Sequence, residues 1–478
     1  MGKDNETGKL EWRINVEDGT SERLDPPAGS GLSRRVAVWF KCLVMNRFVL
    51  GTVASMEKAW RIGAEEPTKV VHCLKVGLAL SLVSIFYYMR PLYEGVGGNA
   101  MWAIMTVVVV FDSNIGATFS KCINRVVATL LAGSLGIGVH WMAAQSGSGE
   151  PLVIAGSVFL FASAATYSRF VPSFKARFDY GAMIFILTFS LVSVSGYRVD
   201  KLIALAQQRV STIAIGTSIC IIISMFFCPI WAGVQLHHLL QRNLDKLADS
   251  LDGCVAEYFK EKEASTQNED EDMNKKIKGF MCVLNSKGPE ESMANFARWE
   301  PAHGSFNFRH PWKQYLKAGA SMRRCAYCLE NLTICINSET EVPDHLKNHL
   351  REACLKLSSA SSKILKELAN AMKSTTKSSS MDFLLFGMIS AKQELQERLR
   401  TVPERIEKHE EGEVMEKEGG ENRRSMHEVL PLATLVSLLL ENTDRIQEIV
   451  RAVEELSNLA GFKTGSQRKS DTKPNNHH

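Results

Sequence analysis

The chain divides into a long apolar stretch followed by a longer polar one. From Val70 to Trp231 the sequence is largely apolar, and six runs in it are candidate membrane spans. We place these spans at about residues 70–89, 100–111, 122–143, 151–167, 180–194 and 206–231. Core helices of a large soluble protein would give similar runs, but six runs joined by short links favour a membrane domain.

Beyond Gly233 the pattern changes to that of amphipathic helices in a polar sequence. Leucines recur at helical spacing, beginning with Leu236, Leu239, Leu240, Leu244, Leu247 and Leu251. We therefore predict an all-α membrane protein with six transmembrane helices and a cytosolic C-terminal helical domain. The predicted segments are a disordered tail (1–32), a juxtamembrane helix (33–69), the transmembrane domain (70–232), the C-terminal helical domain (233–403), a charged disordered linker (404–425), a final helix (426–463) and a disordered tail (464–478).

Two stretches about eighty residues apart resemble each other. Ala100–Thr106 is followed by Arg125, and the similar stretch Ala182–Thr188 is followed by Arg209. Spans one to three therefore form one copy of a repeat, and spans four to six form the other. Because three crossings is an odd number, the second copy enters from the opposite side, and we expect two inverted repeats.

Lysine and arginine residues predict how the spans are oriented. Seven of them lie between residues 34 and 69, just before the first span, three follow the fourth, and the loop at 145–150 has none. A cytosolic N-terminus fits this distribution, and six crossings then place the C-terminal half in the cytosol as well. Arg198 and Lys201, in an outer loop, go against the trend.

The spans as drawn contain basic residues but no Asp or Glu. A cation in the hydrocarbon region costs a few kcal/mol unless it faces water, an anion or carbonyl groups. Rings of basic residues are also how pores select anions. We therefore predict an anion pathway formed by Lys75, Arg125, Arg209 and Lys121, with Trp102, Thr106 and Thr188 from the repeated stretches.

Two features of this prediction have simpler alternatives. Lys75, Lys121 and Arg125 could extend to the headgroups as ordinary flanking cations, and Trp102 and Thr106 could serve in helix packing. Arg209 is harder to explain in this way, because it is expected toward the outer face and repeats Arg125. Since Arg125 is expected near the cytosolic end of span three, we predict that the two arginines lie at opposite ends of one path.

The polar half shows no phosphate-binding loop and no catalytic constellation, so we predict an assembly and regulatory domain rather than an enzyme. Cys325 and Cys328 form a lone CxxC with no second pair, which disfavours a zinc site. The eleven cysteines follow no disulfide framework. We expect no metal, no cofactor and no nucleic-acid partner.

Several ordered motifs make the chain similar to one known family, the plant aluminium-activated malate transporters, which are anion channels. The motifs are Lys75–Leu80, Trp102–Phe111, Asn124-Arg125, Phe178–Gly181, Cys228–Gly233, Trp299-Glu300-Pro301 and Glu455–Ser457. The resemblance implies a homodimer with a pore that passes malate and smaller anions. It assigns pore cations to Lys75, Arg125 and Arg209. It also implies a regulatory or structural role for Trp299, Glu300 and Pro301.

Our hypothesis is a homodimeric anion channel in a lipid bilayer, which passes malate and inorganic anions and is gated by its cytosolic helices. The alternative is a coupled exporter of organic or aromatic acids, and a membrane-anchored scaffold without transport is a third class. The missing intramembrane carboxylate favours the channel. Both termini are expected in the cytosol, and the membrane is either the plasma membrane or a vacuolar or other endomembrane.

Overall fold

The computed structural model describes residues 51–89, 100–195, 202–260, 276–304, 310–337, 342–402 and 424–464, together with 274 and 306. The predicted tail at 1–32, residues 33–50 of the predicted juxtamembrane helix, residues 404–423 of the predicted linker and residues 465–478 lie outside the described residues. By their contacts the residues form two units, Met1–Val70 and Val71–His478, and each is described by itself.

In the first unit, residues 51–65 form an exposed helix, and a new helix, α2 (Pro67–Tyr88), begins after Glu66. Proline is well tolerated in the first turn of a helix, where its missing N–H has no intrahelical partner to lose. Glu66 also pairs with Lys69 at 2.9 Å on the exposed surface. The helix α2 then continues into the second unit.

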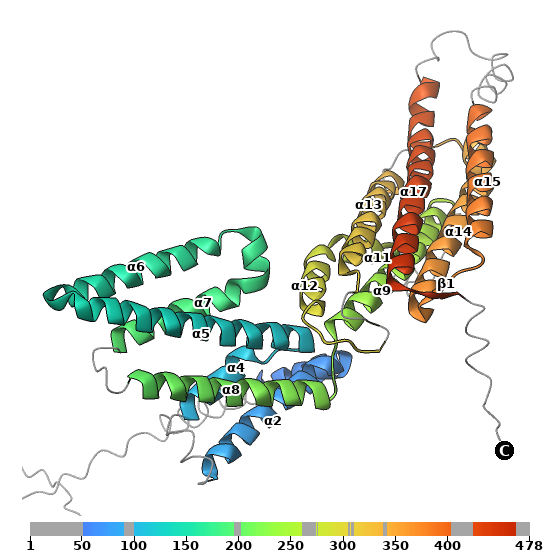
Figure 1. The fold of residues 1–478 in the computed structure, drawn as a ribbon. Coiled ribbons are helices and arrows are strands. Elements are labelled where there is room, and N and C mark those ends of the chain that lie inside the picture. The colour runs from blue at the N-terminus through green and yellow to red at the C-terminus, as the bar shows by residue number, and fades with distance from the viewer. Residues whose placement is uncertain are drawn as a thin grey trace, which may run out of the picture. The chain divides into compact units, whose positions relative to one another are not determined.

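Six apolar helices make up the first part of the chain (Figure 1). They are α2, α4 (Ala100–Val110), α5 (Ile115–Gln145), α6 (Glu150–Ser168), α7 (Pro172–Ser195) and α8 (Leu202–Phe226), with a short 3-10 turn, η1 (Gly147–Gly149), before α6. Within the described ranges, five of them are long and apolar enough to cross a membrane, and α4 is shorter, with 11 residues. The predicted all-α membrane class is confirmed.

The spans as drawn from the sequence start too late at two helices. The helix α5 starts at Ile115 rather than near residue 122, and α7 starts at Pro172 rather than near residue 180. Their first turns hold small and charged residues, which lower the local hydropathy but do not interrupt the helix. As a consequence Asp179 lies within α7, where it pairs with Arg169 at 2.7 Å.

Side-chain contacts fix the relative directions of α5 and α7. Near the start of both helices, the Asn124 amide donates to the Arg177 carbonyl at 2.8 Å. Further along both, a Cβ placed on Gly136 would approach Val192 to 2.7 Å. Since the residue numbers rise together, the two helices run parallel.

The same argument places α4 parallel to α8 and α5 antiparallel to α8. Trp102 of α4 lies against Arg209 of α8, and Thr106, one turn later, lies against Gly216. By contrast, Cys122, near the start of α5, approaches the carbonyl of Thr217, toward the end of α8. Each helix of the first copy therefore runs opposite to its equivalent in the second copy, α4 opposite to α7 and α5 opposite to α8. The predicted inverted repeat requires this arrangement.

The second part of the chain is a bundle of amphipathic helices. They are α9 (Ala232–Tyr258), α11 (Gly279–Leu284), α12 (Lys287–Ala297), α13 (Trp312–Ile336), α14 (Asp344–Ser374), α15 (Met381–Arg400) and α17 (Arg424–Ala460). The predicted leucine stripe of α9, from Leu236 to Leu251, is fully buried except for Leu239. The last helix, α17, packs on α13 and α14, and two short parallel strands, β1 (Thr376–Lys377) and β2 (Lys463–Thr464), pair beside them.

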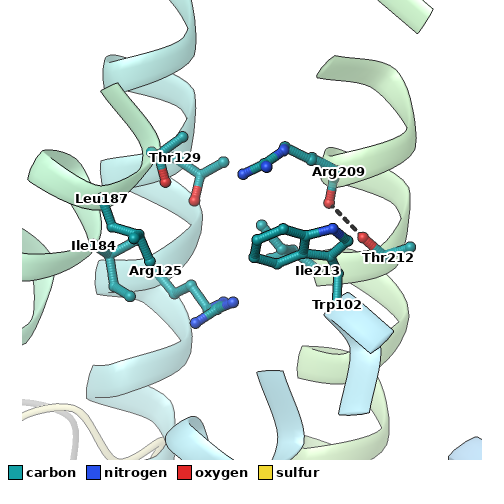
Figure 2. Close-up of a pocket in the computed structure, with 9 residues that line it drawn as sticks. Trp102, Arg125, Thr129, Ile184, Leu187, Arg209, Thr212 and Ile213 are labelled. Carbon is teal, nitrogen blue, oxygen red and sulfur yellow. Dashed lines mark hydrogen bonds between the residues drawn. The ribbon is translucent and has the colours of Figure 1, made fainter. Parts of the chain in front are cut away.

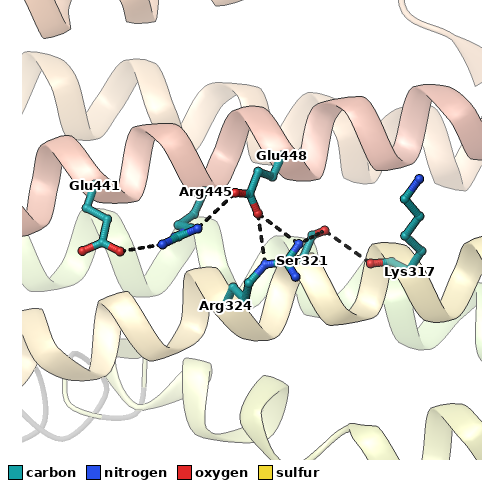
Figure 3. A network of polar contacts seen from close by, with 6 residues as sticks. All are labelled: Lys317, Ser321, Arg324, Glu441, Arg445 and Glu448. Carbon is teal, nitrogen blue, oxygen red and sulfur yellow. Dashed lines mark hydrogen bonds and ion pairs between the residues drawn. The ribbon is translucent and has the colours of Figure 1, made fainter.

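Charged residues join the exposed edges of α13 and α17 (Figure 3). Arg324 of α13 pairs with Glu448 of α17 at 3.0 Å, and Arg445 pairs with Glu441 and Glu448 within α17 itself. Exposed pairs of this kind contribute about 0–1 kcal/mol each. The apolar faces of the two helices therefore supply most of the free energy that holds α17 in place.

One ion pair in this bundle is buried. Glu290 of α12 is fully buried, accepts a hydrogen bond from the Ser286 hydroxyl at 2.6 Å and pairs with Arg323 of α13. A Cβ on Gly319 would overlap the Glu290 carboxylate, so only glycine leaves room for the pair at that turn of α13. The carboxylate is thus fully partnered.

Candidate anion pocket

The membrane helices line a small, partly open pocket (Figure 2). Four helices, α4, α5, α7 and α8, contribute its lining. The lining residues are Trp102, Arg125, Thr129, Ile184, Leu187, Thr188, Arg209, Thr212 and Ile213. The structure therefore brings together both predicted arginines with Trp102 and Thr188, and it adds two threonines that sequence reasoning missed.

Arg125 lies on the inner face of α5, ten residues into the helix. Its side chain is 6% exposed, and its Nη1 donates to the Tyr180 hydroxyl of α7 at 3.1 Å. Its buried Nε has no hydrogen-bond partner among the described residues. A guanidinium at this depth therefore keeps at least one N–H free to bind a further group.

Arg209 reaches the pocket from α8. Its guanidinium lies over the Trp102 ring, 4.2 Å from the ring centroid, which is the geometry of a cation–π contact. Its Nε is also buried without a hydrogen-bond partner in the described part of the chain. Because the guanidinium contacts the indole through its face, the Nε–H remains available as a hydrogen-bond donor.

The two arginines therefore share one pocket, and the expectation that they lie at opposite ends of a path is wrong. Because α5 starts at Ile115, Arg125 lies ten residues into its helix, about 15 Å along the axis. Arg209 lies seven residues into the antiparallel helix α8, about 10 Å along its axis. The late start assumed for span three had placed Arg125 too near the helix end.

No carboxylate pairs with either arginine within the described residues. The nearby acidic groups are already engaged, since Asp112 pairs with Lys121 at 2.9 Å and Asp179 pairs with Arg169. The pocket thus carries two positive charges in a low-dielectric surrounding, and an anion is the species that would compensate them.

Two of the predicted pathway cations lie outside this pocket. Lys75 is 1% exposed and shares one face of α2 with Ala79 and Val83, which pack into the apolar cluster around α4 and α8. Lys121 is partly exposed and paired with Asp112. Neither residue lines the pocket that holds the two arginines.

Thr106 is buried beside the pocket rather than in its lining. Its hydroxyl donates to the Trp102 carbonyl at 2.7 Å, and the Cβ of Thr106 lies close to Gly216. Thr129 was overlooked in the sequence, although it follows Arg125 by one helical turn and so shares its face. This four-residue spacing was the sequence signal that could have identified Thr129.

The predicted Trp299-Glu300-Pro301 motif lies at a junction of helix starts. Glu300 is 4% exposed and accepts backbone N–H groups of Ala232 at 2.5 Å and Gly233 at 3.1 Å, in the first turn of α9. A Cβ added to Gly116, in the first turn of α5, would approach the Glu300 Cγ to 3.1 Å. The carboxylate thus lies at the positive ends of two helices.

The surroundings of Glu300 are tightly packed. Trp299 is half-buried, the Pro301 carbonyl accepts a hydrogen bond from His303, and the His303 ring stacks on Trp231 with centroids 3.7 Å apart. Burial raises the pKa of the Glu300 carboxyl, and the two backbone N–H groups act in the opposite direction. The motif joins α5, which carries Arg125, to the C-terminal bundle.

These features define an all-α membrane protein with a buried cationic pocket and an attached helical domain. The family model described as aluminium activated malate transporter matches residues 60–424 and 398–457 of the chain. The chain belongs to this family, whose members are transporters and not enzymes. The resemblance drawn from the motifs is confirmed.

Curated relatives agree along most of the chain. It is 71% identical to aluminum-activated malate transporter 10 of Arabidopsis thaliana, over 97% of both chains. It is 44% identical to transporter 2 of the same plant, over 87% of this chain and 79% of the relative. It is 41% identical to transporter 1 of Triticum aestivum, over 85% of both chains.

Proposed function

We propose that this protein is an anion channel that passes malate and inorganic anions across a plant membrane. The observation that carries the proposal is the pocket of Arg125 and Arg209, which lacks a carboxylate partner among the described residues. A dianion gains more from two fixed positive charges than a monovalent anion does, and cations are repelled. The names of the curated relatives support malate as one permeant.

The proposed pathway is centred on this pocket. Trp102 and Thr188 line it beside the arginines, and Thr106 supports the Trp102 backbone. Lys75 lies outside it and would act as a more distant source of positive potential, and Lys121, also outside it, is paired with Asp112. We propose a homodimer with both termini in the cytosol, in the plasma membrane or an endomembrane.

The test is voltage clamp of cells expressing the full chain, with malate, nitrate and chloride gradients. The proposal expects currents whose reversal potential follows the anion gradients and does not follow the cation gradient. Electroneutral malate flux without current would overturn it. A protein that reaches the membrane and gives neither current nor flux would favour a scaffold.

A coupled exporter of organic acids is the second candidate, and His140 is the observation that favours it. This residue of α5 is 7% exposed, and neither ring nitrogen has a hydrogen-bond partner in the described ranges. A buried imidazole of this kind could carry a coupled proton. An exporter of this type predicts that His140→Asn abolishes malate flux driven by a pH gradient, whereas a channel predicts that malate current survives.

We further propose that the C-terminal bundle gates the pathway through the Glu300 junction. The contacts of Glu300 with α9 and of Gly116 with α12 mean that a shift of the bundle would move the start of α5. Because the same helix carries Arg125, such a shift would displace one of the two pocket cations.

Gly116→Ala tests this coupling. The added Cβ would overlap the Phe296 carbonyl oxygen, a backbone atom that cannot move without moving α12. We expect a changed open probability with an unchanged ratio of malate to chloride permeability. Gly133→Ala is the matched control on the same helix, because a Cβ there meets nothing within 4 Å. Equal gating in parent and Gly116→Ala would contradict the proposed coupling.

A further inference from the structure

Thr129 differs from most helical threonines and serines in this part of the chain, and of the unpartnered hydroxyls of Thr129, Ser193 and Ser224 only that of Thr129 belongs to a residue that lines the pocket. In the membrane helices, hydroxyls usually bond to a carbonyl one turn back. Examples are Ser84, Thr106, Thr118, Ser157 and Thr217. The Thr129 side chain is 6% exposed, yet within the described residues its hydroxyl has no partner. The Thr129 hydroxyl therefore lacks the hydrogen bond to a carbonyl one turn back that such residues normally make.

The free hydroxyl belongs to the pocket lining. It lies one turn after Arg125 on the same face of α5, and α8 brings Arg209 to the same space. In the view of Figure 2, Thr129 and the Arg209 guanidinium lie toward one end of the pocket and the Arg125 guanidinium toward the other. Three buried groups of the pocket, the Nε atoms of both arginines and the Thr129 hydroxyl, lack partners in the part of the chain described.

An unpartnered buried donor costs free energy, so three in one pocket indicate that a ligand completes them. The groups come from separate side chains on two facing helices, so they suit a ligand with several acceptor atoms. A dicarboxylate offers four acceptor oxygens, enough for the hydroxyl and both guanidinium groups. A halide is a single sphere and cannot span separated donors.

We propose that Thr129 is a specificity-determining residue, whose hydroxyl donates to a carboxylate oxygen of the bound anion and favours dicarboxylates over halides. This inference rests on the proposed anion pathway and names the residue that discriminates within it. The arginines supply charge, which attracts every anion. The hydroxyl supplies a directional donor without charge, which only an anion with further acceptor oxygens can use fully.

The test compares three variants of the full chain by bi-ionic reversal potentials with malate and chloride. Thr129→Val removes the hydroxyl and keeps the shape, and Thr129→Ser keeps the hydroxyl. Thr217→Val is the matched control, because Thr217 of α8 lies outside the pocket lining and its hydroxyl is already bonded to the Ile213 carbonyl at 2.8 Å.

We expect Thr129→Val to lower the ratio of malate to chloride permeability about tenfold, equivalent to ~1.4 kcal/mol. Thr129→Ser and Thr217→Val are expected to stay within about twofold of the parent, the range left by small packing changes. A Thr129→Val ratio within that range, or an equal loss in Thr217→Val, would overturn the assignment. Surface labelling confirms that each variant reaches the membrane.

A binding measurement separates this inference from the proposed function. Malate is titrated into the purified parent and Thr129→Val proteins in detergent. If the parent binds malate but carries no current, the channel proposal fails, and a weaker Thr129→Val complex still supports the role of the hydroxyl. If the parent conducts malate and both proteins bind it equally, the role of Thr129 fails alone. If the parent neither binds nor conducts malate, both proposals fail.

Discussion

The C-terminal bundle and the membrane helices bury charged groups in different ways. In the bundle, the buried carboxylates of Glu290 and Glu300 are matched by Arg323 and by backbone N–H groups of α9. In the membrane helices, Arg125 and Arg209 each keep an unpartnered Nε within the described residues. Completed pairing holds a structure together, whereas incomplete pairing marks the place where a ligand supplies the missing charge.

The largest expected effect is on the completed pair. Arg323→Met leaves the Glu290 carboxylate buried without its counter-charge, so we expect the free energy of unfolding to fall by about 3–5 kcal/mol. Chemical unfolding followed by circular dichroism measures this change. The double variant Glu290→Met/Arg323→Met should recover most of the loss. A single variant within about 1 kcal/mol of the parent would show that the pair is not effectively buried.

At Arg125, which has no carboxylate partner among the described residues, we expect a substitution to reduce function without reducing stability. Arg125→Met removes a cation that has no carboxylate partner, so we expect unfolding stability to stay level or rise. Malate conductance is expected to fall about tenfold or more, equivalent to ~1.4 kcal/mol or more. Voltage clamp and thermal unfolding of the same variant give the two values. A loss of stability comparable to that of Arg323→Met would mean that Arg125 is a structural cation.

A smaller effect concerns pH and the buried histidines of the bundle. The His237 Nε2 donates to the Met372 carbonyl, so in the neutral ring its Nδ1 accepts from the Tyr315 hydroxyl, which in turn accepts from His310 Nε2. Burial lowers the pKa of His237, and it lowers that of His310 to about 4. The unfolded chain therefore binds protons between about pH 6.5 and 4 that the folded bundle does not.

Folding stability should thus fall as pH decreases from about 6.5 toward 4. Thermal unfolding across this range checks the sign. His310→Gln keeps a donor to Tyr315 but does not titrate, so its melting temperature should depend less on pH than that of the parent. An identical pH dependence in both proteins would exclude His310 as a source of the effect.

The smallest expected effect is at Lys121. Its pair with Asp112 is partly exposed and lies outside the pocket, so Lys121→Met should change unfolding free energy by less than about 1 kcal/mol. Malate conductance is expected to stay within about twofold of the parent, since this cation is already neutralised. A conductance loss equal to that of Arg125→Met would place Lys121 in the pathway after all.

Much of the fold follows from local pattern. Hydropathy located six apolar helices, five of them long enough to cross a membrane, and leucine spacing identified α9 and its buried face, because both signals depend on near neighbours in the chain. Helix starts were less predictable. The polar first turns of α5 and α7 are helical by backbone geometry but resemble loops in composition, and this error displaced the expected depth of Arg125.

The site was predictable only in part. The repeat indicated Arg125 and Arg209, since a buried cation is unusual in an apolar run. The free hydroxyl of Thr129 was not predictable, because it depends on which rotamer the packed helices permit. The contact of Glu300 with Ala232 joins positions far apart in the sequence, and only the folded chain brings them together.

The length of α9 determines how far its two ends would move if the helix tilted at the Glu300 junction. Its 27 residues correspond to a rod of about 40 Å, held by Glu300 at its first turn. A tilt of about 5° around that turn moves the far end by about 3.5 Å and the held end hardly at all. Under the proposed gating, the rod would act as a lever with a long outer arm, which would turn a modest push on the bundle into a torque at the base of α5.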